Sequence, residues 1–192
     1  MRHVYLTGPT TTVSGITVFL PGADVGDAAQ GETAMARVSE ALSLIRRYDP
    51  RRFARIVHDG VRIVFSRHLA HAQYWSPVNV IALNLPSVMR WTAPQTATAI
   101  VHEATHARLS RAGIAPSRAA IARIERRCVE EEISFVRRLP HTDEAFEQWA
   151  EQKRGLLVTK WWTRRGKARR RVALLEREGG PAWLLWLARR LS

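Results

Sequence analysis

The sequence predicts an α+β fold, in which a small N-terminal sheet precedes a mostly helical C-terminal half. Short segments rich in β-branched residues lie before residue 86, and longer segments with apolar residues at helical spacing follow residue 92. Apolar residues make up 46% of the 192 residues, which is a globular composition. We therefore expect one folded domain over residues 1–155, followed by a basic tail over residues 156–192.

The first half of the chain predicts strands and one long helix. Strands bounded by Gly, Pro and Asn residues are expected at residues 16–20, 61–65 and 78–85. The third is apolar on both faces apart from two asparagines, as in a strand that is largely covered. A helix is expected at residues 32–47, because its apolar residues recur at helical spacing, and Asp49-Pro50 closes it.

The helix at residues 92–112 has the clearest start and stop signals. Thr92 is a suitable N-cap, Pro94 fits the first turn, and Gln95 can complete a capping box. Gly113 ends this helix. Two further helices are expected at residues 117–138 and 142–154.

The helix at residues 92–112 carries the sequence His102-Glu103-Ala104-Thr105-His106. Histidines four residues apart lie on one face of a helix, so both imidazoles can bind one zinc ion. The carboxylate of Glu103 can then take a proton from a zinc-bound water, whose pKa the metal lowers to about 7. The alternative is a pair of surface histidines on an amphipathic helix, with no metal.

Two histidines leave a zinc site weak, so a third ligand is expected. No further histidine follows the motif at His-x-x-Gly-x-x-His spacing, which makes a carboxylate of the next helix the candidate. At about 100° per residue, Glu125 and Glu132 share the apolar face of that helix. They lie about 10 Å apart along its axis, so one is expected to be the ligand and the other to support it or to pair with an arginine. Glu130 and Glu131 are expected to be dispensable charges on the solvent side.

The motif, followed after 18 residues by Glu125, resembles the gluzincin pattern of thermolysin-like proteases and zinc aminopeptidases. In that pattern a glutamate at similar spacing on a following helix is the third zinc ligand. The resemblance covers residues 92–140, and small Cys128, three places after Glu125, is similar to several HExxH peptidase families. It implies a zincin-like fold with Glu103 as general base and acid, and with zinc held by His102, His106 and Glu125, with Glu132 as the runner-up.

Several departures from the pattern leave the substrate class undefined. The chain has no Gly-x-Met-Glu-Asn-like exopeptidase segment and no Asn-Glu-x-x-Ser-Asp block. We expect the strand at residues 78–85 to be similar to the edge strand that lines the cleft and pairs with an extended peptide. Tyr74, near His68 and His71, is a weaker catalytic candidate that could donate a hydrogen bond to an oxyanion; an ordinary turn is the alternative. Cys128 is expected to be a small core residue and not a nucleophile.

The net charge of +13 is concentrated near the C-terminus, where residues 151–192 contain 12 Lys/Arg and three Glu. Such a tail attracts nucleic acid, an anionic membrane surface or acidic protein without selecting among them. Its tryptophans could seat it at a membrane interface or pack against the domain. The single cysteine excludes an internal disulfide, and no secretory signal or membrane span is evident. We expect a cytoplasmic location, with peripheral attachment to the membrane as an option.

Two functions from different classes fit these features. The first is a zinc-dependent hydrolase, a metallopeptidase that cleaves peptide or protein substrates with the help of Glu103. The alternative is a non-catalytic basic protein that binds nucleic acid or an anionic membrane and holds a structural or relic zinc site. Metal content and the effect of replacing Glu103 distinguish the two.

Overall fold

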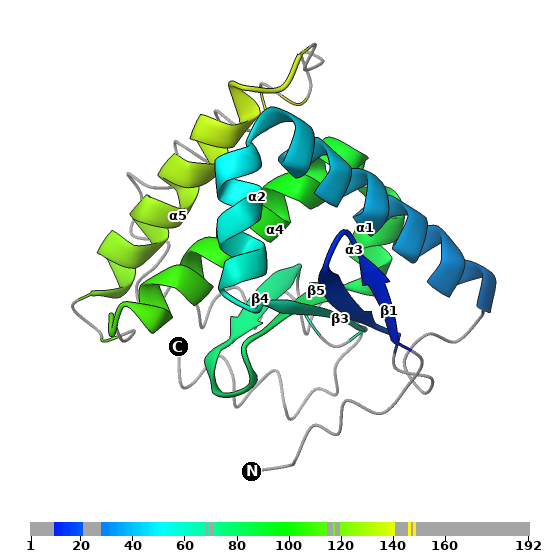
Figure 1. The fold of residues 1–192 in the computed structure, drawn as a ribbon, viewed down its shortest axis with the longest axis horizontal. Helices are drawn as coiled ribbons and strands as arrows, with labels where there is room; N and C mark the ends of the chain where they lie inside the picture. The colour runs from blue at the N-terminus through cyan, green and yellow to red at the C-terminus, as the bar shows by residue number, and fades with distance from the viewer. Residues whose placement is uncertain are drawn as a thin grey trace, which may run out of the picture.

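The computed structural model describes residues 10–20, 28–67, 69, 71–114, 117, 120–140, 146 and 148. The basic tail and nearly all of the helix expected at residues 142–154 lie outside these residues. The described part has the expected α+β architecture, with a small N-terminal sheet and a helical C-terminal half (Figure 1). None of its helices combines the length and the apolar character that crossing a bilayer requires.

Five strands form one sheet in the order β1-β2-β3-β5-β4. Their bounds are β1 Thr10–Val13, β2 Ile16–Phe19, β3 Arg62–Ser66, β4 Ala72–Trp75 and β5 Val80–Asn84. The three central strands, β2, β3 and β5, are parallel, and an antiparallel strand borders them on each side. A short 3-10 turn, η1 (Ser76–Val78), joins β4 to β5 and ends at Asn79, which has a φ of 50°. Asn tolerates this left-handed conformation better than most residues do.

The topology corrects the assignment of the edge strand. The strand expected at residues 78–85 is β5, which hydrogen-bonds to β3 on one side and to β4 on the other. The edge next to the helices is therefore β4, a strand that the sequence analysis did not predict, as it did not predict β1. All five residues of β5 are buried, because strands flank it on both sides and its side chains join the main core on one face and a smaller apolar cluster on the other.

The five helices are α1 Ala28–Tyr48, α2 Pro50–His58, α3 Leu85–Arg90, α4 Ala93–Arg111 and α5 Ile121–Val136. Asp49-Pro50 ends α1 as expected, but it also begins α2. The side chain of Asp49 accepts a hydrogen bond from the backbone N–H of Arg52 at 3.1 Å, and Pro50 occupies the first turn. Asn84 caps α3 in the same way, with its side chain accepting from the N–H of Ser87 at 2.8 Å.

The N-terminal cap predicted for α4 is confirmed. The side chain of Thr92 accepts a hydrogen bond from the backbone N–H of Gln95 at 3.4 Å, and the Gln95 side chain accepts from the N–H of Thr92 at 2.9 Å. Gly113 follows the helix with a φ of 76°, a conformation that glycine adopts without strain.

Helix α4 lies at the centre of the molecule. It packs against α1, α5 and β4, so every residue from Thr96 to Val101 is buried. Its apolar residues join those of α1 and of the adjacent sheet face in one core, in which Leu42, Ile63 and Ile100 are fully buried. Burial of each such side chain stabilises the fold by roughly 1.5–3 kcal/mol. The core thus fixes the helix that carries the His-Glu-x-x-His motif.

Candidate metal centre

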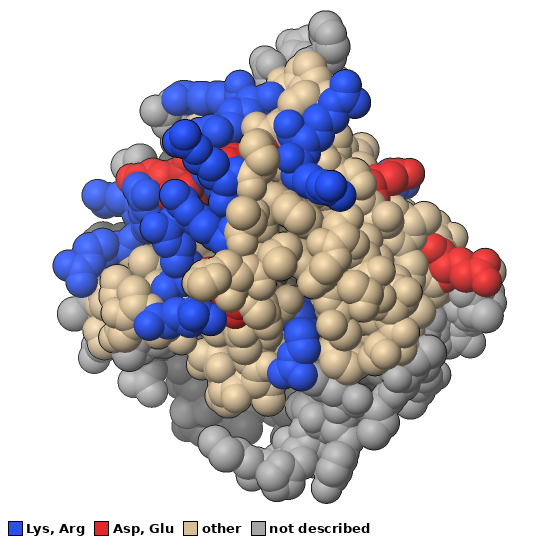
Figure 2. Space-filling model, viewed as in Figure 1, with Lys and Arg blue, Asp and Glu red and all other residues tan. Residues whose placement is uncertain are grey.

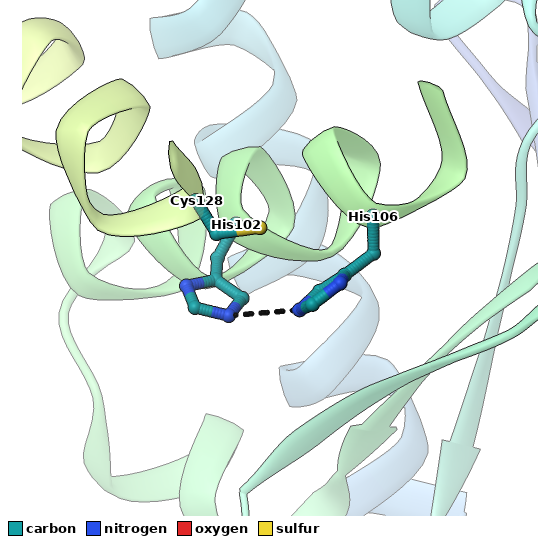
Figure 3. A group of neighbouring side chains, drawn as sticks. All are labelled: His102, His106 and Cys128. Atoms are coloured by element: carbon teal, nitrogen blue, oxygen red, sulfur yellow. Dashed lines mark hydrogen bonds between the residues drawn. The ribbon is translucent and has the colours of Figure 1, made fainter. Parts of the chain in front are cut away.

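Helices α4 and α5 pack side by side and bring the motif opposite the glutamates of α5. The rings of His102 and His106 leave α4 on the same side, and the thiol of Cys128 reaches toward them from α5 (Figure 3). The side chains of Glu125 and Glu132 are 8% and 3% exposed, respectively. Two histidines and two carboxylates predicted from the sequence therefore meet in one largely buried cluster.

Three donor atoms form a compact triangle in this cluster. Nε2 of His102 lies 3.2 Å from Nε2 of His106. Oε2 of Glu125 lies 3.4 Å from the first of these nitrogens and 3.6 Å from the second. Each corner of the triangle is a donor atom of one of His102, His106 and Glu125. These are the three residues that the gluzincin resemblance implies as zinc ligands.

Glu132 contacts the other ring nitrogen of His102. Its Oε1 atom bonds to Nδ1, so the Nε2 atom of the same ring points into the triangle. Burial lowers the pKa of His102, but hydrogen bonds to Glu125 and Glu132 outweigh it and raise that pKa to about 10. A carboxylate on the distal nitrogen of a histidine fixes the orientation of the ring and increases the basicity of the nitrogen that faces a metal.

Glu103 occupies the side of α4 that faces the sheet edge. Its Oε2 atom accepts a hydrogen bond of 2.7 Å from the backbone N–H of Tyr74 in β4. The side chain is buried, and burial raises the pKa of its carboxyl group. Glu103 is thus held next to the two histidines and outside the triangle of donor atoms.

Cys128 is a fourth potential donor. Its sulfur and one ring nitrogen from each of His102 and His106 all lie within 4.8 Å of one another. The residue is fully buried, as expected for a small core residue. Burial and the surrounding carboxylates raise the pKa of the thiol.

The structure assigns Tyr74 a contact other than the expected one. The hydroxyl group of Tyr74 donates to Oδ1 of Asn79 at 3.1 Å, whereas the backbone of the same residue binds Glu103. Tyr74 therefore contacts the site through its main chain. His71 is exposed and its ring lies 6.1 Å from that of Trp91, while His68 lies outside the described residues.

The expectation of a solvent-side Glu131 is wrong. This carboxylate is 14% exposed and lies 2.5 Å from the guanidinium groups of both Arg52 and Arg127. Arg52 also pairs with Asp49, so the ion pairs connect α2 with α5. Glu130 is 51% exposed and pairs with Arg127 at 3.5 Å. The sequence carried no signal for the Arg52 contact, because 79 residues separate the two side chains.

Comparisons with other proteins give no match: no family model fits the chain, and neither curated proteins nor solved structures resemble it significantly. Interpretation of the site therefore depends on its own geometry and donor chemistry.

Proposed function

We propose that this chain is a zinc-dependent hydrolase of the metallopeptidase type, with a zincin-like arrangement of α4, α5 and β4. The triangle of donor atoms carries the proposal. Ligands at tetrahedral positions 2.0–2.2 Å from zinc lie about 3.3–3.6 Å from one another. The separations of 3.2, 3.4 and 3.6 Å are close to this spacing, which supports His102, His106 and Glu125 as the ligands of one zinc ion.

The surroundings of the triangle support a catalytic role for the site. Glu132 orients the ring of His102, and Glu103 leaves its carboxylate outside the ligand set. Zinc, when bound, supplies Lewis-acid chemistry and lowers the pKa of a coordinated water to about 7. Glu103 is the group that would accept the proton of the attacking water and return it to the leaving amine.

The strand β4 supplies the second element of the proposal. It is the edge strand of the sheet and lies against α4, with the N–H of Tyr74 directed at Glu103. An edge strand binds an extended peptide through main-chain hydrogen bonds. We therefore assign to β4, and not to β5, the role of aligning a peptide or protein substrate beside Glu103, through outward main-chain groups other than the N–H of Tyr74, which Glu103 already binds.

Cys128 supports a second candidate, a structural zinc site. A fourth protein ligand would close the coordination sphere, and closed four-ligand sites are typical of structural zinc. The sulfur lies close enough to both imidazoles for such a site. The chain would then be the non-catalytic basic protein, with zinc stabilising the contact between α4 and α5.

Two measurements on the purified protein test the proposal together: its metal content and its hydrolysis of an unfolded protein substrate. We expect about one zinc per chain, lost in His102→Ala and in His106→Ala. Glu103→Gln should keep the zinc and lose hydrolysis, because an amide cannot accept the proton. Purified protein that stays metal-free after incubation with zinc would overturn the proposal. Loss of zinc from Glu103→Gln would overturn the role of this residue.

Cobalt substitution separates the catalytic from the structural site. A thiolate ligand gives cobalt(II) a near-ultraviolet charge-transfer band, which histidine and carboxylate ligands do not give. The hydrolase proposal predicts no such band and an unchanged metal affinity in Cys128→Ser. A strong band that disappears in Cys128→Ser would establish the closed site.

A further inference from the structure

Arginines gather on one face of the described domain. Figure 2 shows the basic side chains concentrated over α2 and α5. Six of them line two adjacent hollows on this face: Arg52, Arg55, Arg108, Arg123, Arg126 and Arg127. Only Asp59, Glu130 and Glu131 line the same hollows with negative charge. The surface, called here the arginine face, is therefore net positive within the folded domain itself.

The arginine face is concave. The first hollow has a volume of about 230 Å³ and lies between α2, α4 and α5. The second, of about 260 Å³, lies between the C-terminal half of α4 and the outer side of α5. Leu109 and Arg127 line both hollows, so the two adjoin each other and together involve three helices.

Four of these arginines have charge to offer a ligand. Arg52 and Arg127 are engaged by carboxylates of the protein. Arg55, Arg108, Arg123 and Arg126 are exposed, and none of them forms an ion pair within 4 Å in the part of the chain that the structure describes. The planar guanidinium group matches phosphate oxygens in a bidentate geometry.

We propose that the arginine face binds the phosphate backbone of double-stranded nucleic acid. A duplex backbone presents closely spaced phosphates to the arginines that line both hollows, whereas a membrane surface takes up apolar side chains, and among the described residues Ile114 is the one exposed large apolar residue that lines either hollow. No aromatic side chain lines either hollow, so the face lacks the stacking platforms by which proteins bind single strands. Arg123 and Arg126 are both exposed and lie one helical turn apart on α5, so both can contact phosphates of one duplex.

The face is separate from the metal centre. Arg123 and Arg126 are on the exposed side of α5, whereas Glu125, Cys128 and Glu132 are on its buried side. None of the four arginines is a candidate metal ligand, so zinc content can serve as a folding control for variants of the face.

Two double variants of the full chain test the proposal. They are Arg55→Ala with Arg108→Ala in the first hollow, and Arg123→Ala with Arg126→Ala in the second. The control is Arg37→Ala with Arg90→Ala, which removes the same charge from α1 and α3. The probe is a fluorescein-labelled 25-base-pair DNA duplex of scrambled sequence, with binding followed by anisotropy over a range of salt concentrations.

Each double variant of the face removes two phosphate contacts. The slope of log K against log salt should therefore become shallower by about 1.8, and affinity at about 0.1 M salt should fall at least tenfold. The control should lose less than about threefold. Equal losses in the control and in the face variants would overturn the proposal, since overall charge would then explain the binding. Loss of binding to phosphatidylserine vesicles with duplex binding retained would also overturn it, in favour of a lipid surface.

Discussion

Glu125 and Glu132 occupy the same face of α5, yet they contact different atoms of one histidine. Glu125 lies at Nε2 of His102 and Glu132 at Nδ1. Burial raises the pKa of Glu125, but its hydrogen bonds to His102 and His106 outweigh this and lower the pKa to about 2. The seven-residue spacing, which rises about 10 Å along the helix, thus places one carboxylate at the donor triangle and the other behind the ring.

Amide substitutions should separate the two roles. Glu125→Gln is expected to weaken zinc binding at least about 100-fold, because two histidines alone hold zinc poorly. Glu132→Gln should weaken zinc binding only about tenfold, since a residue that orients a ligand contributes less to metal affinity than the ligand itself does. Competition with a chromophoric chelator measures both, with exposed Glu130→Gln as the control of unchanged affinity. A larger effect of Glu132→Gln than of Glu125→Gln would exchange the assignments.

Glu131 predicts an acid-dependent loss of stability. Burial raises its pKa, but the hydrogen bond from Arg52 outweighs this effect, so the pKa of the Glu131 carboxyl group lies below its ordinary value of 4.5. A depressed pKa in the folded state stabilises the protein above pH 4.5, and this contribution is lost as the pH falls through the folded-state pKa. Glu131→Gln should therefore lower the free energy of unfolding by about 1–2 kcal/mol at pH 7 and by much less near pH 3. Urea titrations at both pH values, with Glu130→Gln as control, measure the difference.

Periodicity accounts for what could be predicted at this scale. The angles of Glu125 and Glu132 on one helix follow from sequence spacing alone, and both lie in the expected cluster. The contact of Glu131 with Arg52 could not be predicted in this way, because helix α2 approaches from a distant part of the chain. The hydrogen bond from the backbone N–H of Tyr74 to Glu103 is equally non-local. It could not be predicted from the residue type at position 74, because almost any residue offers the same backbone N–H.

The helix boundaries show how capping residues can be misread. Thr92, Pro94 and Gln95 identify the start of α4 correctly, although α3 ends only at Arg90 and the extended Trp91 alone separates it from the cap. Asp49-Pro50 was interpreted only as a stop, although the same chemistry starts α2 directly after α1. A capping residue with proline in the next turn is equally suited to ending one helix and beginning another.

The capping box of α4 should contribute measurably to the free energy of unfolding. Thr92→Ala removes the side-chain oxygen that accepts from the N–H of Gln95 and should lower the free energy of unfolding by about 1 kcal/mol. Thr92→Ser keeps an oxygen in place and should cost no more than a few tenths of that amount. Urea denaturation of the two variants compares them directly, and equal losses would show that the methyl group of Thr92 matters more than the cap.

The strands were harder to predict than the helices because pairing partners determine them. β5 has the apolar composition of a covered strand, and the structure confirms that it is buried. Which strand borders the sheet depends on the hairpin through η1, which adds β4 on the outer side. The four residues of β4 are too short a segment to show a reliable alternation of polar and apolar positions.

At the scale of the whole chain, two regions are enriched in positive charge. The arginine face belongs to the described domain, and residues 151–192 add 12 Lys/Arg against three Glu. Truncation of the chain distinguishes the arginine face from the basic tail, because it removes only the tail.

Truncation after Gly155 should leave zinc binding unchanged and weaken retention on heparin. Retention of the full chain should fall steeply with salt, because exposed charges are screened, and the truncated chain should elute at lower salt. The arginine face should keep the truncated chain from losing retention altogether. An insoluble or zinc-free truncated chain would contradict the division into a domain and a separate tail.

The bond between Glu103 and Tyr74 has a consequence for the solution behaviour of the protein. Asn84 donates its N–H to the carbonyl of His71, and alternation along the antiparallel pair then turns the N–H of Tyr74 outward, away from β5. An outward N–H on a border strand invites pairing with the same strand of another molecule. A buried carboxylate covers it here. Glu103 thus also protects the open border of the sheet against self-association into larger aggregates.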